Sequence, residues 1–598
     1  MTELSNQKQV ARPYHDLNTP FTVDEKGAFA EYIVQDPDSM PEIALGATIV
    51  ISDSRLSSNF WIAGRIVGLR AISPFNPDRE NLLYLNDEVN DPTSVLDKIT
   101  GPHTHQPMVI RVQLDREIDM IDANSRKYSS YPIQRPPSSV SRLFFPNIVP
   151  QTNDPSPSMR EILDIKEHGI SLGNVGFGNS PYQNQNEFLT YKWDIENLDN
   201  KHVFIVGESG SGKTVFLKNL AYELRKKSKD HRVILTDVQG DIIQLLLPDI
   251  AEILKPSGWQ CQVETETPDQ ATNHLKNYQL IIPATKSGSS TNTIALKKLA
   301  KNRGIQVREI GLRLQDLSLP SDVEYLFRSS SNQVGMLLDE EADYLKSSNV
   351  NQPVTIANLR GALRSMLQRA GKNNQVTSNG GTNYLQSTFF AGLRALRSLE
   401  DYFDFHQLSL SLASNPLDYF DFDGTSILYL DELDQDERIM WEMQLVKWLY
   451  NNKKANWNAY VFFDEAHQII PAKPVGIGAL GTFERLRVNF EKLAREGRKF
   501  GINLILSTQN PKDLHPIVPE QCPTRIIMKI NPRNASYAFL EPELAMVANR
   551  FSAGQFWIQS PFNGTPDWVR VHSWAPPLAH EPMTNFWDKV IQKAREEL

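Results

Sequence analysis

The sequence predicts a mixed α/β protein organised around one parallel β-sheet, and three observations predict it. Four apolar residues, Val203 to Val206, lead into a glycine-rich loop and then into apolar residues at helical spacing up to Leu224. Two other apolar runs of strand length end in acidic residues, at Asp237 and at Asp464. Segments with helical spacing stand between such runs, and this alternation is typical of a parallel sheet covered by helices.

The glycine-rich loop has the pattern Gly-x-x-x-x-Gly-Lys-Thr and is expected to bind nucleotide phosphates. Its residues are Gly207, Glu208, Ser209, Gly210, Ser211, Gly212, Lys213 and Thr214. Glycines let backbone N–H groups turn inward around phosphate oxygens, and the start of the following helix adds partial positive charge. Lys213 would reach the β- and γ-phosphates, and the Thr214 hydroxyl would ligate Mg²⁺. ATP and Mg²⁺ are therefore the expected cofactors; the alternative is a chance match in a glycine-rich turn.

Composition is that of an ordinary globular chain: 598 residues, 40% hydrophobic, 22% charged, with a net charge of −9. The only two cysteines, Cys261 and Cys522, exclude a disulfide framework and fit a reducing compartment. No apolar run has the length of a membrane span and the N-terminus is polar, so we expect a cytoplasmic protein without membrane contact. Because the net charge is negative, nucleic acid would need a local basic stripe such as a pore lining.

Changes in pattern along the chain predict six parts. Residues 1–26 are expected to form a flexible arm, 27–150 a small β-barrel, and 151–250 the first part of the nucleotide-binding core. Residues 251–420 are expected to form a helical insertion, 421–577 the second part of the core, and 578–598 a C-terminal helix. Gly64 and Gly68, inside one predicted strand, indicate bulges. A predicted helix from Thr293 to Leu314 is basic, which is more often a solvated face than a binding site.

An acidic pair follows the apolar strand that ends at Phe463. Asp464 is expected to bind Mg²⁺, directly or through water. Glu465 is expected to polarise the water that attacks the phosphate. The alternative is that the pair caps the start of a helix.

Another buried strand ends at Gln509, and a basic segment precedes that strand. The Gln509 amide could sense the γ-phosphate or orient the water, or it could satisfy loop backbone groups. Arg495 and Arg498 lie in the basic segment. Either one could stabilise phosphoryl charge in a neighbouring subunit's site, or both could complement the dipole of a helix C-terminus.

These elements, in this order, resemble the HerA/FtsK group of hexameric ATPases, and HerA in particular. The resemblance is carried by Gly64-Arg65-Ile66-Val67, by the phosphate loop, by Asp464-Glu465-Ala466-His467, and by Leu493 to Gly501 running into Ser507-Thr508-Gln509. It extends from Gly27 to Pro577, apart from the helical insertion. The chain departs from it at Gln509-Asn510-Pro511, where relatives often have Gln-Arg-Pro.

The resemblance implies a RecA-like P-loop NTPase core in a homohexameric ring, with ATP sites between subunits and double-stranded DNA in the pore. It implies catalytic roles for Glu465 and Gln509, and an arginine finger acting in trans, with Arg498 favoured over Arg495. The ring would be a DNA translocase that works with a partner nuclease or another effector. The alternative is a platform in bacterial anti-phage defence that scaffolds a nuclease or a sirtuin-like NAD hydrolase and mainly senses ATP. A conjugative coupling motor is disfavoured because no membrane segment is found.

Overall fold

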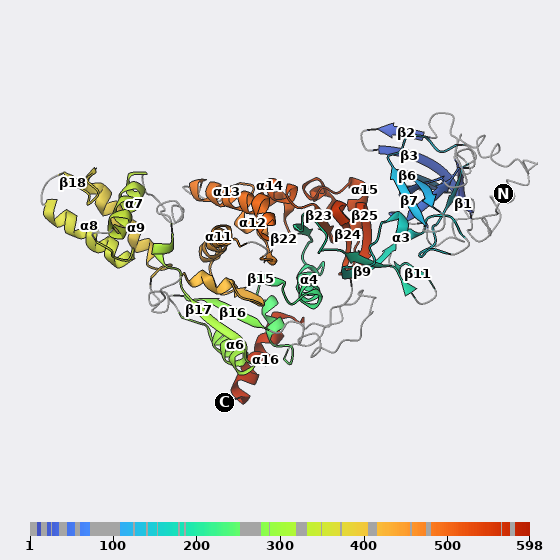
Figure 1. Ribbon diagram of the computed structural model, residues 1–598. Helices are drawn as coiled ribbons and strands as arrows, with labels where there is room; N and C mark the ends of the chain where they lie inside the picture. Colours follow the sequence, from blue (N-terminus) through green and yellow to red (C-terminus); the bar gives the residue numbers. More distant parts are fainter. Residues whose placement is uncertain are drawn as a thin grey trace, which may run out of the picture. The chain divides into compact units, whose positions relative to one another are not determined.

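The computed structural model (Figure 1) describes residues 9–13, 21–24, 27–34, 43, 45–53, 60–71, 108–122, 126–138, 141–151, 154–177, 180–184, 187–250, 277–285, 288–317, 332–347, 350–370, 374–404, 415–454, 457–473, 480–563, 565–573 and 580–597. The chain divides into two compact units. The first comprises Met1–Asp199, Ser257–Gln262 and Thr524–Ala575, and the second comprises Asn200–Pro256, Val263–Pro523 and Pro576–Leu598. Within the described ranges, no helix is long and apolar enough to cross a membrane.

The first unit begins with a sheet of eight strands. Their order is β2 (Phe21–Asp24), β3 (Gly27–Val34), β1 (Gln9–Pro13), β8 (Arg142–Phe144), β4 (Thr48–Ser52), β5 (Phe60–Ala71), β6 (Met108–Asp122) and β7 (Lys127–Tyr131). Because β3 also pairs with β6, the path from β3 to β6 closes on itself around a core that includes Ile49, Ile62 and Ile110. The register between β5 and β6 shifts at Gly64 and at Gly68, which confirms the predicted bulges.

Two strands of this sheet come from the segment that was expected to be a flexible arm. Strand β1 pairs with β3 and β8, and β2 pairs with β3. The expectation is therefore wrong for Gln9–Pro13 and Phe21–Asp24. The physical reason is that unpaired strand edges offer backbone donors and acceptors, which even a polar segment can satisfy. Residues 1–8, 14–20, 25 and 26 lie outside the described residues.

The rest of the first unit is an antiparallel sheet with short accompanying elements. Its strands follow the order β13 (Thr190–Trp193), β9 (Ile170–Phe177), β25 (Thr565–His572), β24 (Gln555–Ser560) and β23 (Thr524–Ile527). The short elements are α3 (Met159–Ile162), β10 (Ser180–Pro181), β11 (Gln183–Asn184), β12 (Glu187–Phe188) and α15 (Pro542–Ala548).

The second unit is built on a parallel sheet. Its strands follow the order β14 (Val203–Val206), β22 (Ile502–Thr508), β21 (Ala459–Phe463), β15 (Arg232–Asp237), β20 (Thr425–Tyr429), β16 (Tyr278–Pro283) and β17 (Gln306–Ile310). Every residue of β14, β20, β21 and β22 is buried, as expected for parallel strands covered on both faces. The helices are α4 (Lys213–Lys227), α6 (Thr291–Asn302), α11 (Gln435–Asn451), α12 (Ala466–Ile469), α13 (Leu480–Glu496), α14 (Ile517–Glu520) and α16 (Met583–Glu596). The predicted mixed α/β fold is confirmed.

The helix expected from Thr293 to Leu314 is wrong in its second half. Helix α6 ends at Asn302, and the chain turns at Gly304, whose φ is +74°. It then enters β17, which pairs in parallel with β16 and extends the sheet. Periodicity alone does not readily distinguish the end of a helix from a short strand of alternating pattern. Here the segment forms a strand because the edge of β16 is open for pairing.

The basic residues around α6 make contacts within the chain. Lys297 lies 2.8 Å from Glu309, and Arg303 lies 3.3 Å from Glu597 beyond the end of α16. Lys298 donates to the backbone carbonyl of Ala594 on α16, at 2.7 Å. Figure 1 shows α6 and α16 side by side. Lys298 and Arg303 therefore help to hold the C-terminal helix.

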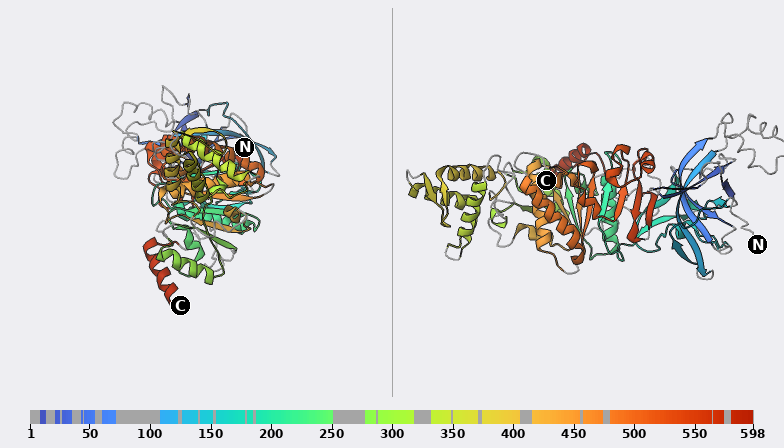
Figure 2. Two further views of the ribbon diagram at one scale, coloured as in Figure 1. Left: turned by 90° about the vertical axis from the view of Figure 1, so that its left-hand side faces the viewer. Right: turned by 90° about the horizontal axis from the view of Figure 1, so that it is seen from above.

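Among the described residues between β17 and β20, three α-helices form a group that adds no strand to the parallel sheet. They are α7 (Asn332–Lys346), α8 (Ile356–Ala370) and α9 (Gln386–Leu399), accompanied by the hairpin of β18 (Gln375–Thr377) and β19 (Asn383–Leu385). The helices stay together as one group in each view of Figure 2, where they are yellow to olive. Their mutual core includes Leu337, Leu363 and Leu396, all fully buried.

Candidate functional site

The phosphate loop lies where the sequence predicts it, between β14 and α4. Gly207 donates its N–H to the carbonyl of Thr508, at 3.2 Å, which ties the loop start to the end of β22. Gly210 and Gly212 have φ values of +76° and +89°, a region that side chains with a Cβ rarely adopt. Ser209 and Gly210 are exposed at the loop tip, and Thr214 is the second residue of α4.

Lys213 meets both residues of the acidic pair. Its Nζ donates to Glu465 Oε1 at 2.6 Å and lies 3.3 Å from Asp464 Oδ1. The Lys213 side chain is only 5% exposed, and the two carboxylates only 4% each. About 250 residues separate the loop from the pair, so the parallel sheet brings them together by placing β14 and β21 on either side of β22.

Glu465 has an unusual backbone and several hydrogen-bond donors. Its φ is +52°, a conformation that is costly for a residue with a Cβ and that often marks a functional position. Burial acts to raise its pKa. Hydrogen bonds from His467, the charge and hydrogen bond of Lys213, and the N–H of Gln509 overcome that effect and lower the pKa to about 2. Glu465 is thus a carboxylate at neutral pH.

The acidic pair is not a helix cap of the usual kind. Glu465 is the residue before α12, but its side chain makes no capping hydrogen bond to that helix. Asp464 Oδ1 accepts hydrogen bonds from the Ser507 hydroxyl and from the N–H of Glu465, the latter at 3.0 Å. These contacts hold the two carboxylates at the carboxyl end of β21, beside the loop.

The oxygen donors at this edge of the sheet fit Mg²⁺. The Asp464 carboxylate and the Thr214 hydroxyl are hard oxygen ligands, and Mg²⁺ takes few protein ligands when phosphates and water complete its shell. The pair already accommodates a cation, because the Lys213 ammonium contacts both carboxylates. The described residues contain no cluster of three or more acidic, histidine or cysteine side chains that could hold a metal by itself.

Gln509 contacts the site through its backbone. Its N–H donates to Glu465 Oε2 at 3.2 Å, and its side chain is partly exposed. The sequence predicts two possible roles for the Gln509 side-chain amide. In the structure, Gln509 also holds the carboxylate of Glu465 through its main-chain N–H.

In the structure, the two predicted arginines, Arg495 and Arg498, do not contact the acidic pair of their own chain. Arg495, in the last turn of α13, is 58% exposed and pairs with Glu491 at 2.8 Å. Arg498 follows in a 3₁₀ turn, Gly497–Phe500, and is exposed. Among the described residues, neither arginine makes a hydrogen bond or ion pair with Lys213, Asp464 or Glu465.

Two side chains near Glu465, those of His467 and Gln239, were not singled out as site residues from the sequence. His467 Nδ1 lies 3.3 Å from Glu465 Oε2 and 3.0 Å from the Thr508 hydroxyl. Gln239, just after β15, has its Nε2 at 3.5 Å from Glu465 Oε1. The sequence feature that could have identified them is their position shortly after strands whose carboxyl ends meet at one edge of a parallel sheet.

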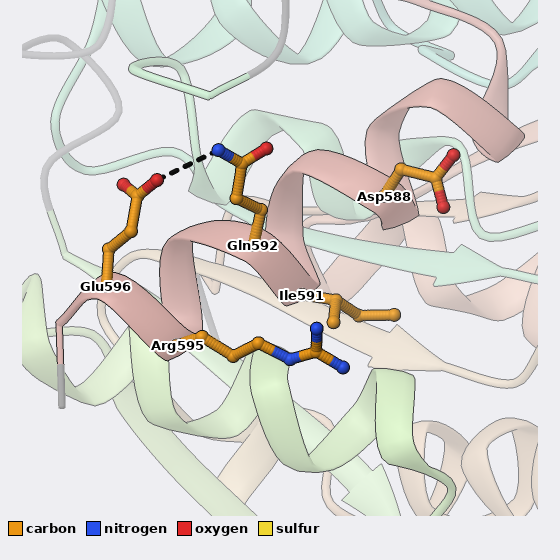
Figure 3. Close-up of a pocket in the computed structure, with 5 residues that line it drawn as sticks. All are labelled: Asp588, Ile591, Gln592, Arg595 and Glu596. Carbon is orange, nitrogen blue, oxygen red and sulfur yellow. Dashed lines mark hydrogen bonds between the residues drawn. The ribbon is translucent and has the colours of Figure 1, made fainter.

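A surface hollow elsewhere contains none of these residues. All of its described lining residues come from α16: Asp588, Ile591, Gln592, Arg595 and Glu596 (Figure 3). Gln592 donates to Glu596 one turn later, at 2.9 Å. The residues expected to bind nucleotide therefore lie at the sheet edge and not in this hollow.

Comparison with known proteins supports the resemblance seen in the sequence. Residues 178–390 match the family described as the central domain of helicase HerA. The chain carries a HerA-type central domain. A segment of 75 residues is 43% identical to a probable DNA double-strand break repair helicase HerA from Methanocaldococcus jannaschii. A segment of 145 residues is 28% identical to a probable helicase of the same organism. The HerA-type match includes the phosphate loop and ends before the acidic pair.

These matches are partial. They cover 12% and 23% of this chain and span 13% and 27% of the two relatives. Among solved structures, VirB4 of Thermoanaerobacter pseudethanolicus aligns with 69% of this chain and 98% of its own, at 12% identity and a TM-score of 0.43. The function of the whole chain is therefore inferred from the candidate site described above.

Proposed function

We propose that this chain is an ATP-hydrolysing motor that forms a homohexameric ring and moves along double-stranded DNA. One observation carries the proposal: a phosphate-loop lysine, Lys213, meets two buried carboxylates, Asp464 and Glu465, at the carboxyl end of a parallel strand. The HerA-type central domain gives the nucleic-acid context. The strand order, with β22 between the loop strand and the acidic strand, supports a RecA-like core, and the closed sheet of the first unit supports a small barrel.

The residues present can carry out hydrolysis of ATP. The loop N–H groups and Lys213 would bind the β- and γ-phosphates, which draws the Lys213 ammonium away from Glu465. Thr214 and Asp464 would hold Mg²⁺, which would supply positive charge to offset that of the phosphates. Glu465, ionised at neutral pH, would accept the proton of the attacking water, and Gln509 would orient that water or sense the γ-phosphate.

The exposed arginines fit a site that is completed by a second subunit. Arg495 and Arg498 lie away from the acidic pair of their own chain, and a transferring phosphoryl group needs positive charge to stabilise it. We therefore assign the trans finger to this segment, with Arg498 favoured because Arg495 already pairs with Glu491.

The test is the ATPase rate of the purified chain with and without double-stranded DNA, together with its mass in solution. A hexamer whose turnover rises with DNA, and whose DNA binding weakens steeply with salt, is the expected result. A monomer, or a chain that does not hydrolyse ATP, would contradict the proposal.

A second candidate is an ATP-dependent platform that holds an effector such as a nuclease or an NAD hydrolase. The observation that favours it is the group α7–α9, which adds nothing to the parallel sheet and exposes Met336 (60%) and Phe390 (48%). Exposed apolar side chains mark protein contacts where they form a large contiguous patch. A hexamer whose hydrolysis is indifferent to DNA would support the platform over the motor.

A further inference from the structure

The two oxygens of Glu465 have different surroundings. Oε1 accepts from Lys213 at 2.6 Å and lies 3.5 Å from Gln239 Nε2, so its donors are the ends of long side chains. Oε2 accepts the backbone N–H of Gln509 at 3.2 Å and lies 3.3 Å from His467 Nδ1. One oxygen thus faces a lysine that nucleotide would draw away, while the other is held by the end of β22 and by α12.

The neighbours of His467 determine which ring nitrogen carries the proton. Nδ1 lies between the Glu465 carboxylate and the Thr508 hydroxyl, which is 3.0 Å away. A carboxylate only accepts hydrogen bonds, so Nδ1 must carry a hydrogen to be attracted to it. The Thr508 hydroxyl already accepts the N–H of Asn510 at 3.1 Å, and it is completely buried. It therefore fixes the position of the imidazole against the end of β22.

These contacts form a continuous path around the site. Thr508 accepts the N–H of Gly207, the first residue of the phosphate loop, through its carbonyl. Its hydroxyl contacts His467, His467 contacts Glu465, and Glu465 contacts Lys213 at the other end of the same loop. A hydrogen-bond network that is satisfied at every member is more rigid than its separate pairs.

We propose that His467 is a positioning residue for Glu465. Its Nδ1–H, located by Thr508, anchors Oε2 and leaves Oε1 as the atom that takes the proton from the attacking water. In that step the water oxygen bonds to the γ-phosphorus, the bond from phosphorus to the bridging oxygen breaks, ADP leaves, and the proton resides on Oε1. This inference rests on the proposed hydrolysis of ATP, and it assigns which oxygen of Glu465 is anchored and which accepts the proton.

The first test separates kcat from ATP affinity in the full chain. A displacement of about 1 Å in a catalytic group can cost about 100-fold in rate. His467→Ala should therefore lower kcat by about 10- to 100-fold while the Kd for ATP changes by less than about twofold. His467→Asn, which keeps an N–H donor on a short side chain, should recover part of the rate.

The second test uses variants of Thr508. Thr508→Val keeps the shape and removes the hydroxyl, so it should lower kcat as His467→Ala does, and Thr508→Ser should recover rate. Because the two residues act through one contact, the double variant should lose no more than the worse single variant. His168→Ala is the matched control, since His168 is exposed in the first unit.

Several outcomes would overturn the proposal. They are an unchanged kcat in His467→Ala, losses that multiply in the double variant, or a weakened Kd with kcat intact. Nitrogen-15 chemical shifts of the His467 ring, assigned with His467→Asn, add a readout that does not need turnover. Protonation at Nδ1 is expected, and an Nε2–H tautomer would refute it. Loss of DNA stimulation with normal basal turnover would refute the motor and leave this positioning role intact.

Discussion

At the scale of single residues, the site depends on groups whose protonation the fold sets. Lys213 and Glu465 form a buried pair. Against the effect of burial, the hydrogen bond from His467 and the charge of Lys213 lower the pKa of Glu465 to about 2 and keep it ionised. His202 differs from His467 in that it lies in the core and not at the candidate site. Its Nε2 donates to the carbonyl of Ala494 at 2.8 Å, and its Nδ1 accepts the N–H of Leu504 at 3.0 Å. It is a fully satisfied core side chain, and a neutral one.

Replacing Glu465 with Gln should separate binding from turnover. The amide keeps the size of the side chain but cannot take a proton, so kcat should fall by about 100- to 10,000-fold. Nucleotide should still bind, as followed with a fluorescent ATP analogue. Lys213→Ala is the contrasting variant, because it removes a phosphate ligand and should abolish binding. Normal phosphate release by Glu465→Gln would show that Glu465 is not the base.

His202 should make the fold sensitive to acid. Burial lowers its pKa from 6.5 to about 4. Between these values the unfolded chain takes up a proton that the folded chain does not, so stability falls as the pH falls, by about 1.4 kcal/mol per pH unit. Urea unfolding at pH 7 and pH 5 should show a smaller loss for His202→Gln than for the unsubstituted chain. Equal losses in the two proteins would contradict this assignment.

At the scale of elements, α7 holds the β18–β19 hairpin through two adjacent glutamates. Glu341 is fully buried and accepts the backbone N–H of Asn379 at 2.8 Å and its side-chain Nδ2 at 2.9 Å. Glu340 accepts from hydroxyls of the hairpin, including that of Tyr384 at 2.9 Å. The hairpin, which pairs three residues of β18 with three of β19, is therefore also held by side chains of a helix.

Glu341→Ala should loosen this hairpin and spare the parallel sheet. The change leaves two donors of Asn379 without a carboxylate, at a cost of about 2–3 kcal/mol. Hydrogen exchange of the amides in β18 and β19 should become faster, while that of β14 and β21 stays the same. Asp343→Ala, at an exposed position of the same helix, is the control. Unchanged exchange in β18 and β19 would show that the hairpin is held by other contacts.

At the scale of the whole molecule, the proposed ring makes the site a shared property of two chains. The acidic pair and the phosphate loop lie together in one chain, while Arg498 lies exposed at the end of α13. In the proposed ring, such a division would let a subunit sense whether its neighbour has bound nucleotide, because the finger would stabilise charge only where a phosphoryl group is present.

Mixed rings test this division. Arg498→Ala alone should be inactive, and so should Glu465→Gln alone. Rings assembled from both should regain part of the ATPase rate, since some interfaces then pair an intact base with an intact finger. The measurement is phosphate release over a range of mixing ratios. Activity no greater than that of the separate variants would place the finger elsewhere.

The sequence by itself determined the features that depend on neighbouring residues. The strand, glycine loop and helix around Lys213, the acids after β21 and the bulges at Gly64 and Gly68 each follow from local spacing and turn chemistry. The expectations that the structure overturned, for the arm and for the helix from Thr293 to Leu314, concern segments that pair with strands from distant parts of the sequence. Pairing energy from distant strands outweighs weak local preference there.

Only the tertiary structure decided which side chains meet. The contact of Lys213 with Glu465 and that of His467 with Thr508 arise because β22 lies between β14 and β21, and strand order is not encoded in the periodicity of any one strand. The parallel sheet collects the carboxyl ends of its strands at one edge. Residues separated by hundreds of positions thereby become hydrogen-bond partners, and the roles of the two oxygens of Glu465 follow from that arrangement.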